Sequence, residues 1–283
     1  MADELVRSVL FMPASNPRAI DKARTLPCDV AVLDLEDAVA PEMKTAARAA
    51  AVEAARSGGF GPRLAVRVNG LDTPWGSDDL DALAGTPVEI IVAPKVEDAR
   101  DVAELGDRLP AGAALWAMIE TPLALFNLDA LCRVDGALAA LMFGTNDLSA
   151  ALGCGLVADR EPLKPWLAAT VAAARAHGLG VIDGVFNRLD DADGFASECN
   201  QGRLYGFDGK SLIHPGQIAT ANATFSPTDD EVAHAMALVA AFADPAAAGR
   251  GAIQVEGSMV ERLHLTAAEA LLRRHDACSR SPD

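Results

Sequence analysis

The chain has 283 residues, of which 51% are hydrophobic and 23% are charged. This length suits one α/β barrel of about 250 residues, and the composition is that of a folded globular enzyme rather than a disordered chain. The net charge of −16 argues against nucleic acid or an anionic membrane as the main partner, because binding to a polyanion needs a basic surface. A small anionic substrate can still bind where basic residues gather, as they do around Arg18 and Lys22.

The cysteines and the N-terminal residues indicate the cellular compartment of the protein. The five cysteines form no Cys-x-x-Cys pair, which predicts free thiols in a reducing compartment rather than disulfides or a zinc site. The N-terminal residues lack the basic and apolar regions of a signal peptide, and no apolar run approaches the roughly 20 residues that span a bilayer. We therefore expect a cytoplasmic protein.

Short apolar runs rich in β-branched residues alternate with Ala- and Leu-rich stretches along the first 225 residues. The predicted helices between the runs include Pro41–Arg56, Asp98–Leu109 and Pro162–His177. The predicted strands are Ser8–Ala14, Val30–Asp37, Leu64–Asn69, Glu89–Lys95, Ala114–Glu120, Ala137–Phe143, Gly180–Phe186 and Gly206–Ile213.

Apolar strands that alternate with helices indicate a parallel sheet covered by helices. Eight units predict a closed (β/α)8 TIM barrel over residues 1–225. The alternative is an open doubly wound sheet, but the Gly-rich phosphate loop that usually follows its first strand is absent.

Residues 226–283 exceed what the last barrel helix requires. Helical stretches are predicted at Pro215–Asn222, Thr228–Ala243 and Glu261–Arg273, and the Gly-containing segment Asp244–Gly257 reads as a flexible connector. We expect residues 226–283 to form a helical extension of the same domain, either a lid or a subunit contact.

Polar residues stand where the predicted strands end, the place where barrel enzymes carry their chemistry. A ring of ion pairs with Arg67 and Lys95 is one interpretation, and it is the preferred one for Asp34 and Asp183 individually. The other interpretation is a divalent cation, because magnesium prefers one or two carboxylates together with water and substrate oxygens. The residues concerned are Asp34, Glu36, Asp37, Arg67, Asn69, Lys95, Glu120, Asp147, Asp183 and His214.

Seven short motifs resemble, in the same order, those of the citrate lyase beta-subunit-like family within the HpcH/HpaI aldolase and malyl-CoA/citramalyl-CoA lyase superfamily. The resemblance covers about residues 7 to 275, and it implies the barrel fold. The motifs are Ser-Asn-Pro-Arg-Ala-Ile-Asp-Lys at 15–22, Leu-Asp-Leu-Glu-Asp-Ala-Val at 33–39, Arg-Val-Asn at 67–69, Pro-Lys-Val-Glu at 94–97, Ile-Glu-Thr-Pro at 119–122, Phe-Gly-Thr-Asn-Asp-Leu-Ser at 143–149 and Gly-Lys-Ser-Leu-Ile-His-Pro-Gly-Gln at 209–217.

The resemblance implies a magnesium-dependent lyase that cleaves a β-hydroxyacyl-CoA into acetyl-CoA, or another acyl-CoA, and a 2-oxo acid. It assigns Mg²⁺, with Mn²⁺ as an alternative, to Glu120 and Asp147. It places Glu36 and Asp37 beside metal-bound water and makes Arg67 the residue that contacts the reacting oxygens. Arginine suits that role because it stays protonated without any tuning of its pKa.

The resemblance also implies a binding site for coenzyme A, which is part of the substrate. Arg18 and Lys22 would hold its nucleotide end, although a solvated helix face is the competing interpretation. His214 would order a turn beside the pantetheine more readily than it would transfer a proton.

Two positions depart from the family pattern. Glu261, in Gly-Ser-Met-Val-Glu at 257–261, stands where lyases of the family have a lid aspartate that protonates the enolate carbon, often across a subunit interface. We expect Glu261 to retain that function, against the alternative of a first-turn helix acid. Asn187 stands where an acidic residue is expected.

Three alternatives stay open at this point. The same metal site could direct water at malyl-CoA in a thioesterase, or serve a pyruvate aldolase that needs no coenzyme A clamp. The chain could instead be a carrier-protein-dependent citrate lyase beta subunit. The extra helices and the resemblance predict a homo-oligomer, a trimer or a hexamer.

Overall fold

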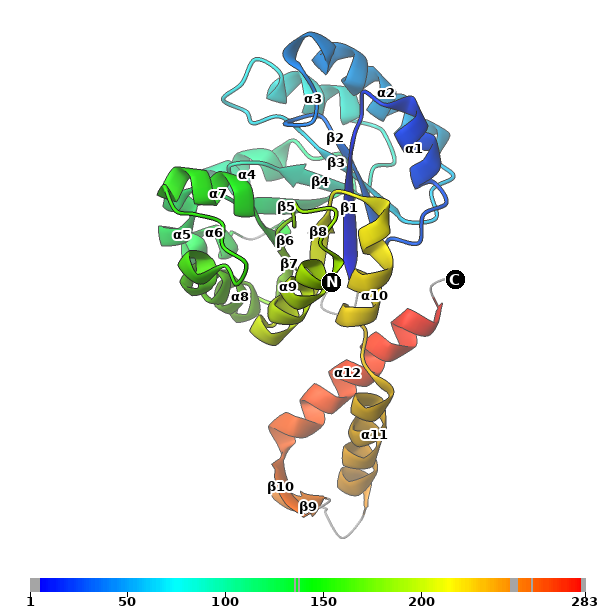
Figure 1. Ribbon diagram of the computed structural model, residues 1–283, viewed down its shortest axis with the longest axis vertical. Coiled ribbons are helices and arrows are strands. Elements are labelled where there is room, and N and C mark those ends of the chain that lie inside the picture. Colours follow the sequence, from blue (N-terminus) through cyan, green and yellow to red (C-terminus); the bar gives the residue numbers. More distant parts are fainter. Residues whose placement is uncertain (1–5, 135, 137, 245–248, 256, 281–283) are drawn as a thin grey trace. The chain divides into compact units, whose positions relative to one another are not determined.

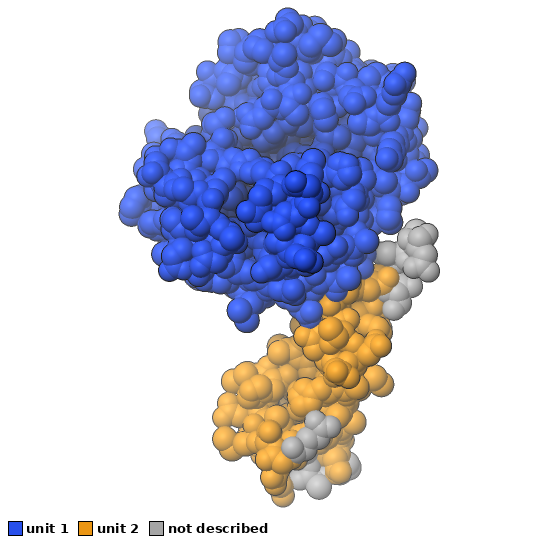
Figure 2. All heavy atoms as spheres, in the orientation of Figure 1, with its two compact units in different colours: residues 1–2, 6–225 blue, residues 3–5, 226–283 orange. Residues whose placement is uncertain are grey.

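The computed structural model describes residues 6–134, 136, 138–244, 249–255 and 257–280. Two compact units divide the chain, one containing Val6–Phe225 and the other the described residues from Ser226 onward (Figure 2). Within the described residues, no helix combines the length and the apolar character that a membrane crossing needs.

Eight parallel strands close into a barrel in the first unit, in chain order (Figure 1). The last strand pairs with the first, with Val9 opposite Ser211, which excludes the open sheet and confirms the predicted (β/α)8 barrel. Ala137, the predicted start of the sixth strand, lies outside the described residues. The strands are β1 (Ser8–Pro13), β2 (Val30–Asp34), β3 (Arg63–Arg67), β4 (Ile90–Ala93), β5 (Ala114–Ile119), β6 (Leu138–Phe143), β7 (Gly180–Asp183) and β8 (Gly209–Leu212).

Helices follow the strands and cover the barrel (Figure 1). The predicted helix Pro41–Arg56 divides into a short 3-10 turn and an α-helix, and Asp98 is the N-cap of the next predicted helix rather than part of it. The helices are α1 (Pro17–Ala23), η1 (Pro41–Met43), α2 (Lys44–Ser57), α3 (Gly76–Leu83), α4 (Ala99–Asp107), α5 (Pro122–Phe126), α6 (Leu128–Cys132), α7 (Thr145–Leu152), η2 (Glu161–Leu163), α8 (Lys164–Ala176), α9 (Ala192–Tyr205), η3 (Pro215–Gln217) and α10 (Ile218–Phe225).

The barrel strands are buried on both faces, and the two faces belong to different apolar clusters. On β2, Val30 and Val32 lie in the smaller cluster, which fills the barrel, whereas Ala31 and Leu33 lie in the cluster that also contains the helices. Successive side chains of a strand point to opposite faces, so the next inward position on β2 is Asp34. Asp34 therefore belongs to the last inward-facing layer of the barrel, and by the same alternation Asp183, which follows the inward-facing Ile182, faces outward.

The second unit corrects the prediction of a connector between two helices. The predicted connector Asp244–Gly257, of which residues 245–248 and 256 lie outside the described residues, contains a strand, and Glu261 ends a second strand instead of starting a helix. The elements of this unit are α11 (Asp229–Ala243), β9 (Ala252–Val255), β10 (Ser258–Glu261) and α12 (Arg262–Arg280).

The strands β9 and β10 form an antiparallel hairpin in which Val260 lies opposite Ile253. Both residues belong to an apolar cluster that also contains Leu238 of α11. Gly257 between the strands has a φ of 83°, a backbone conformation that favours glycine in a tight turn. The glycines that suggested a flexible connector are therefore partly turn residues.

A buried network of four charges joins β7 and β8 to the surrounding loops and helices. Asp183 is fully buried and pairs with Arg160 at 2.7 Å and with Lys210 at 3.1 Å. Glu198 of α9 completes the network at 2.8 Å from Lys210. Burial would raise the pKa of Asp183, but the charges of Lys210 and Arg160 hold that pKa below its usual value. Asp183 is therefore ion-paired, as the preferred interpretation expected, but its partners are Arg160 and Lys210 and not Arg67 or Lys95.

Replacing Asp183 with asparagine should lower the free energy of unfolding by about 3 kcal/mol, because it leaves buried cations without their carboxylate partner. Equilibrium denaturation in urea measures the loss. Asp129→Asn is the matched control, since its ion pair with Arg133 is exposed and surface pairs contribute less than about 1 kcal/mol. A loss as small as that of the control would contradict a stabilising role for Asp183.

Candidate functional site

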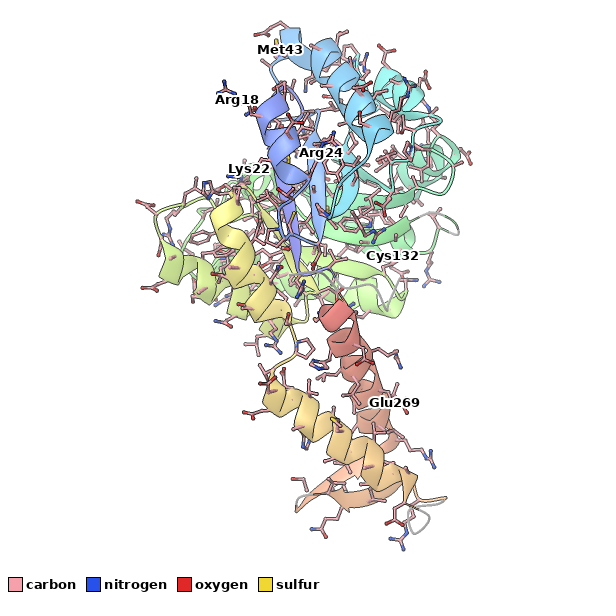
Figure 3. All side chains as sticks on the ribbon, turned by 90° about the vertical axis from the view of Figure 1, so that its right-hand side faces the viewer. Arg18, Lys22, Arg24, Met43, Cys132 and Glu269 are labelled. Carbon is pink, nitrogen blue, oxygen red and sulfur yellow. The ribbon has the colours of Figure 1, made fainter. Side chains whose placement is uncertain are left out.

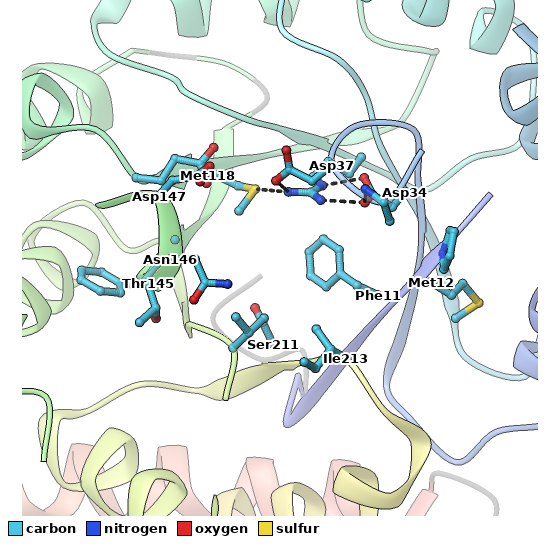
Figure 4. Close-up of a pocket in the computed structure, with 17 residues that line it drawn as sticks. Phe11, Met12, Asp34, Asp37, Met118, Thr145, Asn146, Asp147, Ser211 and Ile213 are labelled. Atoms are coloured by element: carbon cyan, nitrogen blue, oxygen red, sulfur yellow. Dashed lines mark hydrogen bonds and ion pairs between the residues drawn. The ribbon is translucent and has the colours of Figure 1, made fainter. Parts of the chain in front are cut away.

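A pocket of about 360 Å³ lies at the carboxyl end of the barrel strands. Phe11, Asp34, Met118 and Asn146 are seen around it in Figure 4. Its polar lining includes Asp34, Asp37, Arg67, Glu120, Asn146 and Asp147. These side chains come from four different strands or the loops that follow them, so only barrel closure brings them to one pocket.

Arg67 ends β3 and is held by the carboxylate that ends β2. Its Nε and Nη2 donate to the two oxygens of Asp34 at 2.7 and 2.6 Å, while Nη1 lies 2.9 Å from Glu36 Oε2. Burial would lower the pKa of Arg67, but the hydrogen bonds and charge of Asp34 raise it above its ordinary value. Arg67 is therefore a fixed positive charge in the pocket wall, and the prediction of an ion pair for Asp34 is confirmed.

Glu120 follows β5 and is the buried acid of the pocket. It is 2% exposed, and its Oε1 accepts a hydrogen bond of 2.8 Å from the backbone N–H of Lys95. Burial, followed by the negative charge of Glu36, raises the pKa of Glu120 to about 7. A carboxylate in such surroundings is stabilised by a cation, because its ionised form is otherwise costly to bury.

Gly144, between β6 and α7, makes room for Glu120. A Cβ at this position would lie 2.3 Å from Glu120 Cβ and 2.5 Å from Oε2. The φ of Gly144 is −94°, which any residue adopts, so the glycine is required for space and not for backbone conformation. The glycine of the Phe-Gly-Thr-Asn-Asp motif thus positions the glutamate of a different motif.

Asp147 lies in the first turn of α7, and its side chain is 39% exposed at the pocket. Asp37 is also partly exposed and lies 3.4 Å from Arg67 Nη1. Glu36 is buried between Arg67 and Lys95, and burial raises its pKa against the opposing effect of Arg67. The predicted metal-binding and catalytic residues of the barrel therefore lie at the pocket or contact its lining: Glu120, Asp147, Arg67, Asp37 and Glu36.

The acids fit a magnesium ion. The described part of the chain has no group of three or more His, Cys, Asp or Glu residues arranged as a self-sufficient metal cage. Magnesium does not need such a cage, because it commonly takes one or two carboxylates and completes its octahedron with water and substrate oxygens. Glu120 and Asp147 can supply the carboxylates, because both line the pocket. Glu36 Oε2 is instead occupied by its ion pair with Arg67 Nη1 at 2.9 Å.

Lys95 is a residue of this region that the sequence analysis did not assign to the site. Its Nζ donates to Glu36 Oε1 at 2.7 Å and lies 4.0 Å from Asp147 Oδ2. Its backbone has a φ of 51°, a left-handed conformation that is uncommon for lysine. The Pro-Lys-Val-Glu motif could have pointed to Lys95 as a site residue, but the sequence analysis interpreted Lys95 as one member of a ring of ion pairs.

The residues predicted to bind coenzyme A do not line this pocket. Arg18 and Lys22 are exposed on α1, where Figure 3 shows both side chains projecting from the helix. His214 is exposed and acts as the N-cap of η3, since its Nδ1 accepts a hydrogen bond of 3.0 Å from Gly216 N. The coenzyme A role of all three residues stays a prediction.

Glu261 lies in the second unit, at the end of β10, where it is exposed. Its backbone N–H donates to His264 Nδ1, so the acid precedes α12 rather than lying in its first turn. The predicted catalytic role of Glu261 is untested by this geometry.

Asn187 is exposed in the loop that follows β7 and pairs with Asn146. The Asn187 amide nitrogen donates to Asn146 Oδ1 at 2.6 Å, and the reverse contact is 3.3 Å. The departure at this position therefore fixes an amide that lines the pocket.

Comparison with known proteins agrees with this geometry. The profile of the HpcH/HpaI aldolase/citrate lyase family matches residues 7–215. The chain belongs to this family. The inferred resemblance to citrate lyase beta-subunit-like proteins is thereby confirmed.

Two relatives from Cereibacter sphaeroides differ in their named reaction. A (3S)-malyl-CoA thioesterase is 43% identical over 272 residues, covering 96% of this chain and 95% of the relative. An L-malyl-CoA/beta-methylmalyl-CoA lyase is 33% identical, with the same two coverages. This member of the citrate lyase family is therefore similar to enzymes of both kinds.

A solved structure is also similar over nearly the whole chain. The protein CitE from Mycobacterium tuberculosis, in complex with magnesium, acetoacetate and coenzyme A, has a TM-score of 0.81 and 33% identity. The match covers 97% of this chain and 99% of that chain. The cofactors expected from the sequence are those that this relative binds.

Replacing Gly144 with alanine should displace Glu120 and weaken magnesium binding at least tenfold, roughly 1.4 kcal/mol, because the added Cβ cannot fit beside the glutamate. Isothermal titration calorimetry measures the change. Gly106→Ala is the control, since a Cβ there meets nothing within 4 Å. Unchanged magnesium binding in Gly144→Ala would show either that the added Cβ does not displace Glu120 or that Glu120 is not a metal ligand.

The raised pKa of Glu120 predicts a pH dependence of metal binding. Magnesium needs the ionised carboxylate, which predominates only above the pKa of about 7. Affinity should therefore fall by about tenfold for each pH unit below 7 and level off above about pH 8. Titrations across this range test the sign, and an affinity that stays flat down to about pH 5.5 would show that Glu120 is not a ligand with this pKa.

Proposed function

We propose that the chain is a magnesium-dependent enzyme that acts on a β-hydroxyacyl-CoA of the malyl-CoA type, with hydrolysis of the thioester as its main reaction. One observation carries this proposal: the fixed guanidinium of Arg67 faces the same pocket as Glu120 and Asp147. This arrangement suits an anionic substrate that reacts with the help of a metal ion. The choice of hydrolysis over cleavage of a carbon–carbon bond rests on the 43% identity to a malyl-CoA thioesterase, against 33% to a lyase.

Magnesium held by Glu120 and Asp147 would supply a Lewis acid for the substrate oxygens. Arg67 binds the oxygen on which negative charge develops. It is suited to this because the two-pronged contact with Asp34 fixes its plane and keeps it protonated. Binding and orientation by preformed charges therefore precede any proton transfer.

Asp37 is the acid that we assign to proton transfer in hydrolysis. It lines the pocket with its side chain 58% exposed, whereas Glu36 is locked between Arg67 and Lys95. Asp37 takes a proton from the water that attacks the thioester carbon. The carbon–sulfur bond then breaks, and the proton goes to the departing sulfur, which gives free coenzyme A and the hydroxy acid.

A lyase is the second candidate, because an L-malyl-CoA/beta-methylmalyl-CoA lyase is 33% identical to the chain. In that reaction a carboxylate of the pocket takes the proton of the substrate hydroxyl, and the bond between the hydroxyl-bearing carbon and the thioester's α-carbon breaks. A 2-oxo acid leaves, and an acid must protonate the enolate carbon. We propose that Glu261 is that acid. We also propose that Arg18 and Lys22 contact the nucleotide of coenzyme A and that His214 lies beside the pantetheine. Assembly into a trimer or hexamer, with the second unit as a lid or subunit contact, is part of this proposal.

Mass spectrometry of the products separates these functions. The purified protein is incubated with malyl-CoA, citramalyl-CoA and 3-hydroxy-3-methylglutaryl-CoA, with and without magnesium. Free coenzyme A and the intact hydroxy acid are expected. Acyl-CoA with a 2-oxo acid would instead establish the lyase, and no reaction with any substrate would favour an acyl-carrier-bound substrate.

Variants connect each product to its residue. Glu120→Ala and Asp147→Ala should lower magnesium-dependent turnover at least a hundredfold, about 2.7 kcal/mol in the barrier, and leave the fold intact. If acyl-CoA and a 2-oxo acid are formed, Glu261→Gln should abolish that carbon–carbon cleavage but leave hydrolysis unchanged. Glu269→Gln, an exposed acid of α12, is its control. Activity that survives loss of Glu120 or Asp147 would remove the metal assignment.

A further inference from the structure

Lys95 lies among the acids of the pocket and contacts three of them. Its Nζ is 2.7 Å from Glu36 Oε1 and 4.0 Å from Asp147 Oδ2, and its backbone N–H donates to Glu120 Oε1 at 2.8 Å. It follows β4, and its contacts reach acids that follow β2, β5 and β6. No step of the proposed reaction uses this lysine.

The neighbouring cations have other partners. Arg67 is committed to Asp34 by two hydrogen bonds, and Lys44 is buried with its Nζ on the carbonyls of Leu35 and Glu36. Among the ion pairs of the described residues, Asp147 has one, and its partner is Lys95. Of the two acids proposed to hold the metal, Asp147 is thus paired with the Lys95 ammonium and Glu120 with the Lys95 backbone N–H.

We propose that Lys95 is an internal counter-ion that competes with the divalent cation, so that its ammonium sets the metal affinity of the site. The inference rests on the proposed metal site at Glu120 and Asp147 and deepens it. When the cation binds, Lys95 gives up its long contact with Asp147 and keeps the short one with Glu36. Metal binding then replaces the Lys95 ammonium with a divalent cation beside Asp147, so the metal does not enter a pocket of uncompensated carboxylates.

The charge and the backbone of Lys95 both support this role. Burial would lower the pKa of Lys95, but its hydrogen bond to Glu36 and the charge of that residue raise the pKa above its ordinary value. The left-handed backbone, at a φ of 51°, directs the amide to Glu120 while the side chain reaches Glu36. Strain of this kind persists where the surroundings hold it in place, commonly at functional sites.

The test is the affinity of the full-length protein for MgCl2 and MnCl2, measured by isothermal titration calorimetry on the wild type and three variants. Lys95→Met keeps the length of the side chain and removes its charge. Lys95→Asn also removes the charge, and asparagine tolerates the left-handed backbone, so it guards against a folding defect in the first variant. Lys95→Arg is the matched control that keeps the charge.

Both neutral variants should bind the metal about tenfold more tightly than the wild type, because a like charge a few ångströms away is gone. Lys95→Arg should stay within about twofold of the wild type, by the same Coulomb argument. Unchanged or weaker binding in the folded neutral variants would overturn the inference and make Lys95 a structural brace. A wild type that binds neither metal would overturn the proposed metal site itself, and the inference with it.

Discussion

The structure around the pocket depends on one constraint, the compensation of carboxylates placed in the last inward-facing layer of a closed barrel. Isolated charges are costly to bury, so each acid needs a cation or a hydrogen-bond donor. Asp34, in that layer, pairs with the guanidinium of Arg67, and Asp183, on the outer face of β7, pairs with Lys210 and Arg160. Glu120, by contrast, accepts a hydrogen bond from the backbone N–H of Lys95 and keeps a raised pKa. This difference separates the ion-paired acids Asp34 and Asp183 from Glu120, the acid that we propose binds a cation.

The loops convert this layer into a site by placing small or strained residues where they are needed. Gly144 leaves the space that Glu120 occupies, and Lys95 adopts a left-handed backbone that brings both its amide and its ammonium to the acids. Lys44 holds the carbonyls of the loop that carries Glu36. The chemistry proposed for the pocket therefore relies on residues that no reacting atom touches.

Much of the fold could be predicted, because two-sided burial makes each barrel strand a continuous apolar run. The predicted strand ends ran too far where polar residues follow the apolar ones: the second strand ends at Asp34 and not at Asp37. The hairpin of β9 and β10 was missed because its strands are short and only Val255 and Val260 are buried in it. Lys95 was left out of the site because a sequence shows charge but not the left-handed backbone that aims it.

The sequence by itself determined the family and the barrel, because these depend on local patterns and on motifs in a fixed order. It also singled out Arg67, Glu120 and Asp147, which line one pocket in the structure. Only the tertiary structure decided which acids are already neutralised, because an ion pair such as that of Asp34 and Arg67 joins residues 33 positions apart along the chain. Closure of the barrel sets those distances, and with them the pKa of each carboxylate. Composition and spacing carry no information about either quantity.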